Sequence, residues 1–246
     1  MTTETACEEL VGGDRPLLIV SDHASARVPA DIDLGLPPAL RRTHIAVDIG
    51  VAEVARLLVP RLACRAFLAA QSRLVVDLNR GEADEGLMPV VSDGHPVPGN
   101  VGADRAARLA RFYRPYHAAL AARIAAMGRP FLFSLHSFTP RLASDPDQAR
   151  PWEIGVLYNR DDRAARIAIP MLEAAGLIVG DQQPYSGRDL NETMNRHAEG
   201  NGLPYLGVEL RQDIAATPEG QRRYVEALAP VLERCAALLA SAGGAG

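Results

Sequence analysis

Short apolar runs and longer stretches with apolar residues at helical spacing alternate along the chain. The short runs predict strands at 17–21, 65–69, 73–77, 131–135, 154–158, 177–179 and 205–210. The helical spacing predicts helices at 48–62, 103–127, 161–175 and 217–241. Residues 81–102 are rich in Gly, Pro and Asp, so we expect a long surface loop there. This alternation is typical of an α/β three-layer sandwich, in which helices cover both faces of a mainly parallel or mixed sheet.

Length and composition fit a single globular domain. The chain has 246 residues and no linker-like stretch, so we expect one domain over 1–246, with 1–14 and 242–246 as flexible ends. The net charge of −4, without a run of five like charges, gives no electrostatic reason to expect nucleic acid or a membrane as partner. Three widely separated cysteines and an acidic N-terminus without a signal-peptide pattern favour the cytoplasm.

Residues that carry chemistry follow several of the predicted strands. His23 follows the first strand, His136 follows the fourth, and Glu209 lies near the end of the last one. Ligands of open α/β sheets bind outside the carboxyl ends of the strands. We therefore expect these three side chains to meet at one edge of the sheet.

Two histidines from different strands are suitable ligands for a metal ion. A catalytic zinc site has three protein ligands and one open position for water. Asp48, at the start of a predicted helix, is the best third ligand, although a carboxylate there would also suit the helix dipole. His44 is the alternative third ligand. We therefore predict one divalent metal ion at His23, Asp48 and His136, with zinc preferred over iron, cobalt or manganese.

Glu209 stands between Val208 and Leu210, where an unpaired carboxylate would be costly. Beside a metal and its water, this carboxylate would act as a general base and then as an acid for the leaving nitrogen. The alternative is a structural ion pair with a neighbouring arginine. Of the two, we predict the catalytic role for Glu209.

Six motifs occur in a defined order along the chain. They are SDHAS at 21–25, the helix opening at Asp48, DLNR at 77–80, SLHSF at 134–138, PYSGR at 184–188 and GVELRQD at 207–213. In this order they resemble the N-formylglutamate amidohydrolase family, from Pro16 to the last helix. The order His23, Asp48, His136 and Glu209 is also similar to that of more distant zinc amidases and carboxypeptidases, although Asp48 stands where a glutamate is usual.

The resemblance implies hydrolysis of N-formyl-L-glutamate to formate and L-glutamate, with a role in histidine degradation. Such a substrate is a small anionic N-acyl amino acid with two carboxylates, so at least one arginine fork is expected. Arg80 is the first choice, because Asn79 and Arg80 resemble the substrate-binding pair of carboxypeptidase-like enzymes. The other predicted substrate contacts are Arg73, Arg188, Arg211 and His197.

The sequence leaves two other functions open. A hydrolase of another N-acyl amino acid or of a small peptide amide would use the same metal and base. A non-catalytic ligand-binding protein with this fold belongs to a different class, and the presence of both histidines, Asp48 and Glu209 argues against it. Neither a serine hydrolase nor a nucleotide-binding protein is supported, because GxSxG, GxGxxG and Walker motifs are missing.

Overall fold

A seven-stranded mixed sheet forms the centre of the computed structural model, which describes residues 5–240. Its strands, in the order β1-β3-β2-β6-β9-β7-β8, are β1 Cys7–Val11, β3 Arg65–Ala69, β2 Leu17–Ser21, β6 Phe131–Phe138, β9 Tyr205–Arg211, β7 Ile154–Leu157 and β8 Val179–Asp181. The four strands β3, β2, β6 and β9 run parallel to one another. Strand β1 is antiparallel to β3, and β7 is antiparallel to β9.

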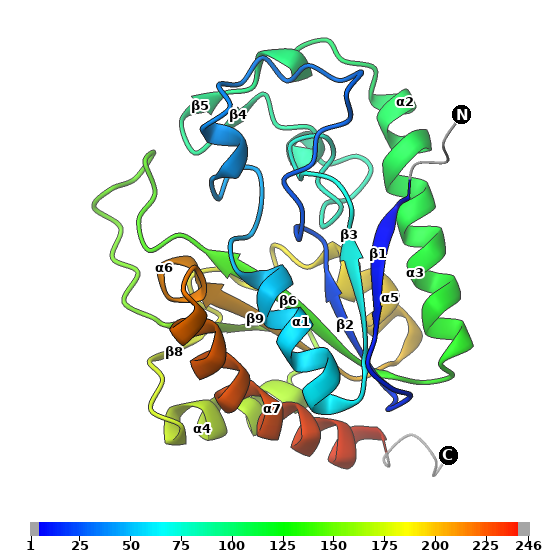
Figure 1. The fold of residues 1–246 in the computed structure, drawn as a ribbon, viewed down its shortest axis with the longest axis vertical. Coiled ribbons are helices and arrows are strands. Elements are labelled where there is room, and N and C mark those ends of the chain that lie inside the picture. Colours follow the sequence, from blue (N-terminus) through cyan, green and yellow to red (C-terminus); the bar gives the residue numbers. More distant parts are fainter. Residues whose placement is uncertain (1–4, 241–246) are drawn as a thin grey trace.

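Helices cover both faces of the sheet (Figure 1). One face packs against α1 Val51–Leu62, α4 Arg163–Ala174 and α7 Pro218–Ala240, and the other against α3 Arg114–Ala126 and α5 Glu192–His197. Helix α2, Arg105–Arg108, precedes α3 in the chain and has no buried residue. The short helix α6 Gln212–Ala215 follows β9 directly. The predicted three-layer α/β sandwich is thus confirmed. Within the described residues, no helix has the length and apolar character needed to cross a bilayer.

The buried strands contribute side chains to both cores. In β2, Leu17 and Ile19 join the core beneath α1 and α7, whereas Leu18 and Val20 join the core beneath α3. Successive residues of a strand point to opposite faces, so a strand that is buried on both sides needs apolar residues throughout. This requirement explains why LLIVS, a continuous apolar run, forms a central strand.

Three parts of the predicted secondary structure differ from the structure. Residues 73–77 form turns rather than a strand, and Cys7–Val11, expected within a flexible end, pair as edge strand β1. The helix predicted at 103–127 is interrupted by a π-helical turn, Leu109–Tyr113, just before Pro115. The expected flexible end at 242–246 lies outside the described residues.

The segment predicted as a long loop contains short elements of its own. Strands β4 Val91–Ser92 and β5 His95–Pro96 form a hairpin, and 3-10 turns occupy Glu85–Leu87 and Pro98–Asn100. The other 3-10 turns are Leu40–Arg42 and Glu199–Asn201. Together with residues 71–80, this segment lies beyond the carboxyl ends of β2 and β3 (Figure 1).

Candidate metal centre and active site

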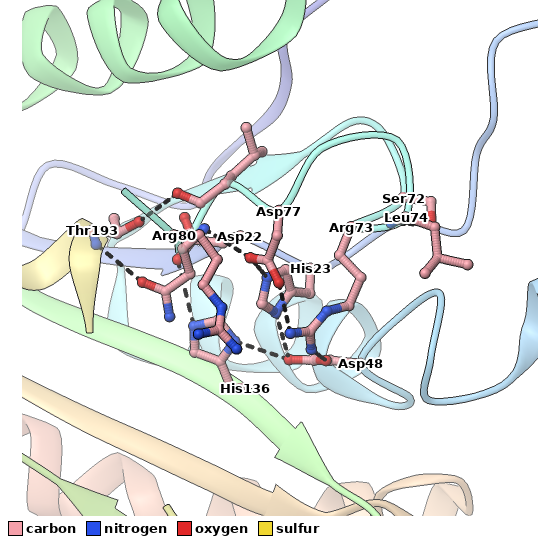
Figure 2. Close-up of polar contacts among 12 residues, drawn as sticks. Asp22, His23, Asp48, Ser72, Arg73, Leu74, Asp77, Arg80, His136 and Thr193 are labelled. Atoms are coloured by element: carbon pink, nitrogen blue, oxygen red, sulfur yellow. Dashed lines mark hydrogen bonds and ion pairs between the residues drawn. The ribbon is translucent and has the colours of Figure 1, made fainter. Parts of the chain in front are cut away.

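Two histidines and one aspartate meet at the carboxyl edge of the sheet (Figure 2). One ligand atom from each of His23, Asp48 and His136 can be chosen so that all three lie within 4.8 Å of one another. Asp48 Oδ2 lies 2.9 Å from His136 Nδ1 and 3.4 Å from His23 Nδ1. All three residues are at least 95 % buried. The structure therefore brings the three predicted ligands together.

Local structure explains how each ligand reaches this point. His23 follows β2, His136 lies within β6, and the two strands are neighbours in the sheet. Asp48 precedes α1, and its backbone N–H donates to the carbonyl of His23 over 3.0 Å. Gly50, the residue before α1, has a φ of 85°, and a Cβ there would lie 2.3 Å from the carbonyl oxygen of Ala215. A glycine is thus required at the turn that carries Asp48 into the site.

Asp48 is not a helix cap in this structure. Its Oδ2 accepts the backbone N–H of Ser137 at 3.2 Å and contacts both histidines, while the start of α1 has no side-chain cap. Burial would raise the pKa of this carboxyl, but the charge of His23 and the hydrogen bond from His136 outweigh it and lower the pKa. The carboxylate is therefore held in its ionised form, as a metal ligand must be.

Each histidine turns its other ring nitrogen toward a second carboxylate. His23 Nε2 lies 2.7 Å from Asp77 Oδ1, and His136 Nε2 lies 3.4 Å from Asp22 Oδ2. Asp22 is fully buried and accepts the hydroxyl hydrogen of Tyr116 at 2.7 Å. A carboxylate beside one ring nitrogen stabilises a proton on that nitrogen, so the opposite ring nitrogen is free to bind a metal. Both histidines thus present Nδ1 toward Asp48.

Arg73 connects two of these carboxylates. Its guanidinium lies 2.7 Å from Asp77 Oδ2 and 3.4 Å from Asp48 Oδ1. Burial would raise the pKa of Asp77, but the charges of Arg73 and His23 outweigh burial and lower it. Because its fork is already occupied, Arg73 orients the acidic residues of the site before any substrate arrives.

Glu209 lies beside His136 in the sheet. The parallel pairing of β6 and β9 sets the two residues opposite each other. Flanking Val208 and Leu210 join the core beneath α7, so Glu209 points to the other face. Its Oε2 is buried without a hydrogen-bond partner among the described residues. Burial raises the pKa of Glu209 to about 7, a value suited to a group that takes and returns a proton near neutral pH.

The chemistry of these residues fits a divalent cation. His23 Nδ1 is buried and makes no hydrogen bond with the described residues, although it faces Asp48. Three carboxylates with lowered pKa, Asp22, Asp48 and Asp77, surround one guanidinium, Arg73. Burial would lower the pKa of both histidines, but the neighbouring carboxylates outweigh burial and raise it, so two imidazolium charges balance the remaining negative charge. A divalent ion would replace these two protons with the same charge, and two imidazoles with one carboxylate are ligands that zinc accepts.

A small cavity of about 260 Å³ opens above the cluster. Its lining includes all three ligands, Glu209 and Arg73, together with Asn79, Arg80, Tyr185 and the rim residues His44 and Asp93. Among residues 5–240, the Arg80 guanidinium has a single carboxylate contact, a long one of 3.4 Å to Asp84 Oδ2. Its guanidinium therefore keeps donors for a ligand, in contrast to that of Arg73.

The family model of N-formylglutamate amidohydrolase matches residues 15–216. The chain belongs to this family. A gene product of Agrobacterium tumefaciens shares 31 % identity, with 96 % of each chain covered and a TM-score of 0.85. An N-formylglutamate amidohydrolase from Ralstonia eutropha has the same fold, with 20 % identity, 96 % of this chain and 98 % of that chain covered, and a TM-score of 0.68. The search of curated proteins finds no match.

Membership in the N-formylglutamate amidohydrolase family confirms the resemblance that the motifs indicated. Of the predicted substrate contacts, Arg73, Asn79 and Arg80 line the cavity. His44, the alternative metal ligand, instead lies 2.8 Å from Asp93 at the rim. It is not part of the histidine–aspartate cluster.

The other three predicted substrate contacts, Arg188, Arg211 and His197, do not line the cavity in this structure. Arg188 is exposed to solvent. Arg211 pairs with Asp213 at 2.9 Å. His197 is buried in α5, where its ring stacks on that of His117. Arg188 and Arg211 lie within motifs, but spacing in the sequence does not show in which direction a side chain points.

Three residues behind the metal ligands, Asp22, Asp77 and Tyr116, were not predicted from the sequence. Asp22 and Asp77 lie within the SDHAS and DLNR motifs, so their position next to chosen residues was the available signal. Tyr116 gives no such signal, because 94 positions separate it from Asp22 in the chain.

Proposed function

We propose that the protein is a metal-dependent amidohydrolase that cleaves N-formyl-L-glutamate to formate and L-glutamate. Family membership supports the amide-hydrolase class. The observation that carries the proposal is the buried cluster of His23, Asp48 and His136 with Glu209 alongside it. A metal-assisted hydrolase requires these elements: a three-residue ligand set and a base close to it.

His23, Asp48 and His136 would hold the metal ion, with zinc as the first candidate. When bound, such an ion polarises the scissile carbonyl and lowers the pKa of water. The chain's own contribution is to keep the ligands ionised and oriented. Asp77 and Asp22 do this by holding the far ring nitrogens of the two histidines.

Glu209 is the proton carrier of the proposed reaction. Its carboxylate takes a proton from water as the water oxygen attacks the formyl carbon. The same proton then passes to the amide nitrogen as the C–N bond breaks, which releases formate and the amino group of glutamate. A pKa of about 7 allows the carboxyl to act in both directions near neutral pH.

Asn79 and Arg80 are the proposed substrate anchors. They line the same cavity as Glu209, and the guanidinium of Arg80 can receive a carboxylate in fork geometry. The cavity volume of about 260 Å³ suits a small acyl amino acid rather than a long peptide. A cytoplasmic role in histidine degradation is part of the proposal, and the free cysteines Cys7, Cys64 and Cys235 agree with a reducing compartment.

Metal content and formate release, measured on the same preparation, test the proposal. We expect chelator-sensitive formate release from N-formylglutamate. We expect Glu209→Gln to retain metal but lose at least about 100-fold in kcat, in line with loss of a general base. The matched control is Glu219→Gln, because Glu219 is an exposed side chain on α7 and should not affect activity.

The outcomes separate the competing functions. If the protein binds metal and releases no formate but hydrolyses another N-acyl amino acid, it is a hydrolase with a different substrate. Absence of metal after reconstitution, with ligand binding but no turnover, would favour a binding protein of the same fold. Full activity of Glu209→Gln would refute the role of Glu209.

A further inference from the structure

One helical face lies behind both halves of the site. Tyr113 ends the π-helical turn, and Tyr116 and His117 follow in α3, so the three side chains are neighbours on one face. Tyr116 hydroxyl donates to Asp22 behind the metal ligand His136. Tyr113 hydroxyl donates to the carbonyl of Arg80 at 2.8 Å, and His117 Nε2 lies 3.0 Å from the carbonyl of Leu78. The helix thus contacts the metal side and the substrate side separately.

The proton positions on His117 follow from its partners. The carbonyl of Leu78 can only accept, so His117 Nε2 must carry the hydrogen. In a neutral ring Nδ1 is then an acceptor, and it receives the hydrogen of His197 Nε2 at 2.9 Å. The two rings stack with an interplanar angle of 13°. A buried chain of hydrogen bonds therefore runs from α5 through α3 to Leu78.

A second set of hydrogen bonds connects α5 to the same segment. The backbone N–H of Thr193 donates to Asn79 Oδ1 at 3.0 Å, and the Thr193 hydroxyl donates to the carbonyl of Leu78 at 3.3 Å. Because Asn79 Oδ1 is occupied, the amide Nδ2 is the group that remains for a ligand. Residues 78–80 belong to no helix or strand, so these contacts hold the backbone in place of a regular ladder.

We infer that Tyr113, His117 and His197 are positioning residues that hold Leu78–Arg80 so that Asn79 and Arg80 present their donors to the substrate carboxylate. This inference rests on the proposed function for the identity of the substrate. None of the three residues lines the cavity or belongs to the histidine–aspartate cluster, and Tyr113 reaches Arg80 only through its backbone carbonyl. Their loss should therefore weaken substrate binding and leave the metal and Glu209 in place.

Two substitutions each remove one hydrogen bond to residues 78–80, and a third should restore the bond to Leu78. Tyr113→Phe removes only the hydroxyl, and His117→Leu removes the donor to Leu78. His117→Gln places an amide donor near the position of Nε2, so it should rescue. Loss of one hydrogen bond corresponds to roughly 5- to 10-fold in binding, so we expect KM for N-formylglutamate to rise by that factor with kcat within about twofold.

Tyr116→Phe is the matched comparison on the same helix face. Its hydroxyl contacts Asp22 rather than residues 78–80, so it should weaken metal retention against a chelator and leave KM near the wild-type value. A merely structural role of α3 would instead move KM, kcat and metal retention together in all four variants. That result would overturn the inference, as would an unchanged KM in Tyr113→Phe.

Hydrogen exchange tests the positioning without any substrate. In the full-length, metal-loaded protein, Tyr113→Phe and His117→Leu should increase amide exchange at residues 78–80, and His117→Gln should restore protection. Unchanged amide exchange at residues 78–80 in both Tyr113→Phe and His117→Leu would refute the positioning role. If the wild-type protein releases no formate, the proposed function fails, while the exchange result still decides whether these residues hold the segment.

Discussion

Acid should destabilise the protein through the buried histidine pair. Burial lowers the pKa of both His117 and His197 to about 4, from an ordinary value of 6.5. Between pH 6.5 and 4 the unfolded chain therefore binds protons that the folded chain does not, so stability is complete above this window and falls as pH falls through it. The charged groups near the pair are Arg196, which opposes protonation, and Asp22, which favours it.

The expected loss of unfolding free energy follows from the pH range between the pKa of the unfolded state and that of the folded state. Lowering the pH from 6.5 to 5 covers about 1.5 pH units. Each unit costs about 1.4 kcal/mol of unfolding free energy for each histidine that is protonated only in the unfolded chain, which gives roughly 2 kcal/mol per residue. His197→Gln removes one titrating group but keeps an amide donor for His117 Nδ1. We therefore expect the wild-type protein to lose roughly 2 kcal/mol more unfolding free energy than His197→Gln between pH 7 and 5.

Urea denaturation of both proteins at pH 7 and pH 5 measures this difference. Glu209, with its pKa raised to about 7, has the opposite sign, because the folded chain binds its proton first and gains stability as pH falls. That contribution is common to both proteins and cancels in the comparison. Equal losses in the wild type and in His197→Gln would refute the neutral, buried state of the pair.

Three further predictions concern the metal, the substrate and the core. Asp22→Asn should lower metal affinity by roughly 10- to 100-fold in a chelator competition, and unchanged affinity would contradict an effect of Asp22 on His136. Arg80→Ala should raise KM by roughly 10- to 100-fold with kcat retained in steady-state assays, and an unchanged KM would place the carboxylate site elsewhere. Leu132→Ala, at a fully buried position of β6, should lower the free energy of unfolding by roughly 3 kcal/mol in urea, whereas a loss below about 1 kcal/mol would mean that the core refills the cavity.

The central strands were predictable because burial on both faces leaves a clear pattern. The runs predicted at 17–21 and 65–69 coincide with β2 and β3. The apolar run at 73–77 was misleading, since Val75 and Val76 are buried against the α3 side without joining the sheet. An apolar run reports burial, and only hydrogen bonding decides whether the buried segment is a strand.

Strand β1 was missed for the opposite reason. Its sequence, CEELV, is polar, and its residues are exposed or half-buried. An edge strand with one neighbour has little need for apolar residues, and charges there discourage pairing with other chains. Composition therefore cannot distinguish such a strand from a solvent-exposed tail.

The candidate site divides into a part that strand order predicts and a part that it does not. His23 follows β2, and His136 and Glu209 lie in the carboxyl-terminal halves of β6 and β9, so the parallel order of these neighbouring strands places all three at one edge. The contacts of Asp22 and His117 depend on how α3 lies across the sheet, and no local spacing encodes that packing. Long-range hydrogen bonds of this kind become visible only in the folded chain.

The hydrolytic residues and the substrate anchors should differ in how readily substitutions can change them. Glu209 and His136 are fixed by a ladder in which a one-residue slip would turn both side chains into the opposite core, so the hydrolytic pair tolerates little variation. Asn79 and Arg80 lie on a segment that is held by Tyr113 in the π-helical turn, by His117 in α3 and by Thr193 in α5. Substitutions in those two helices can shift the substrate anchors without disturbing the ladder. Substrate preference within this family should therefore change more readily through the helices behind residues 78–80 than through the metal ligands themselves.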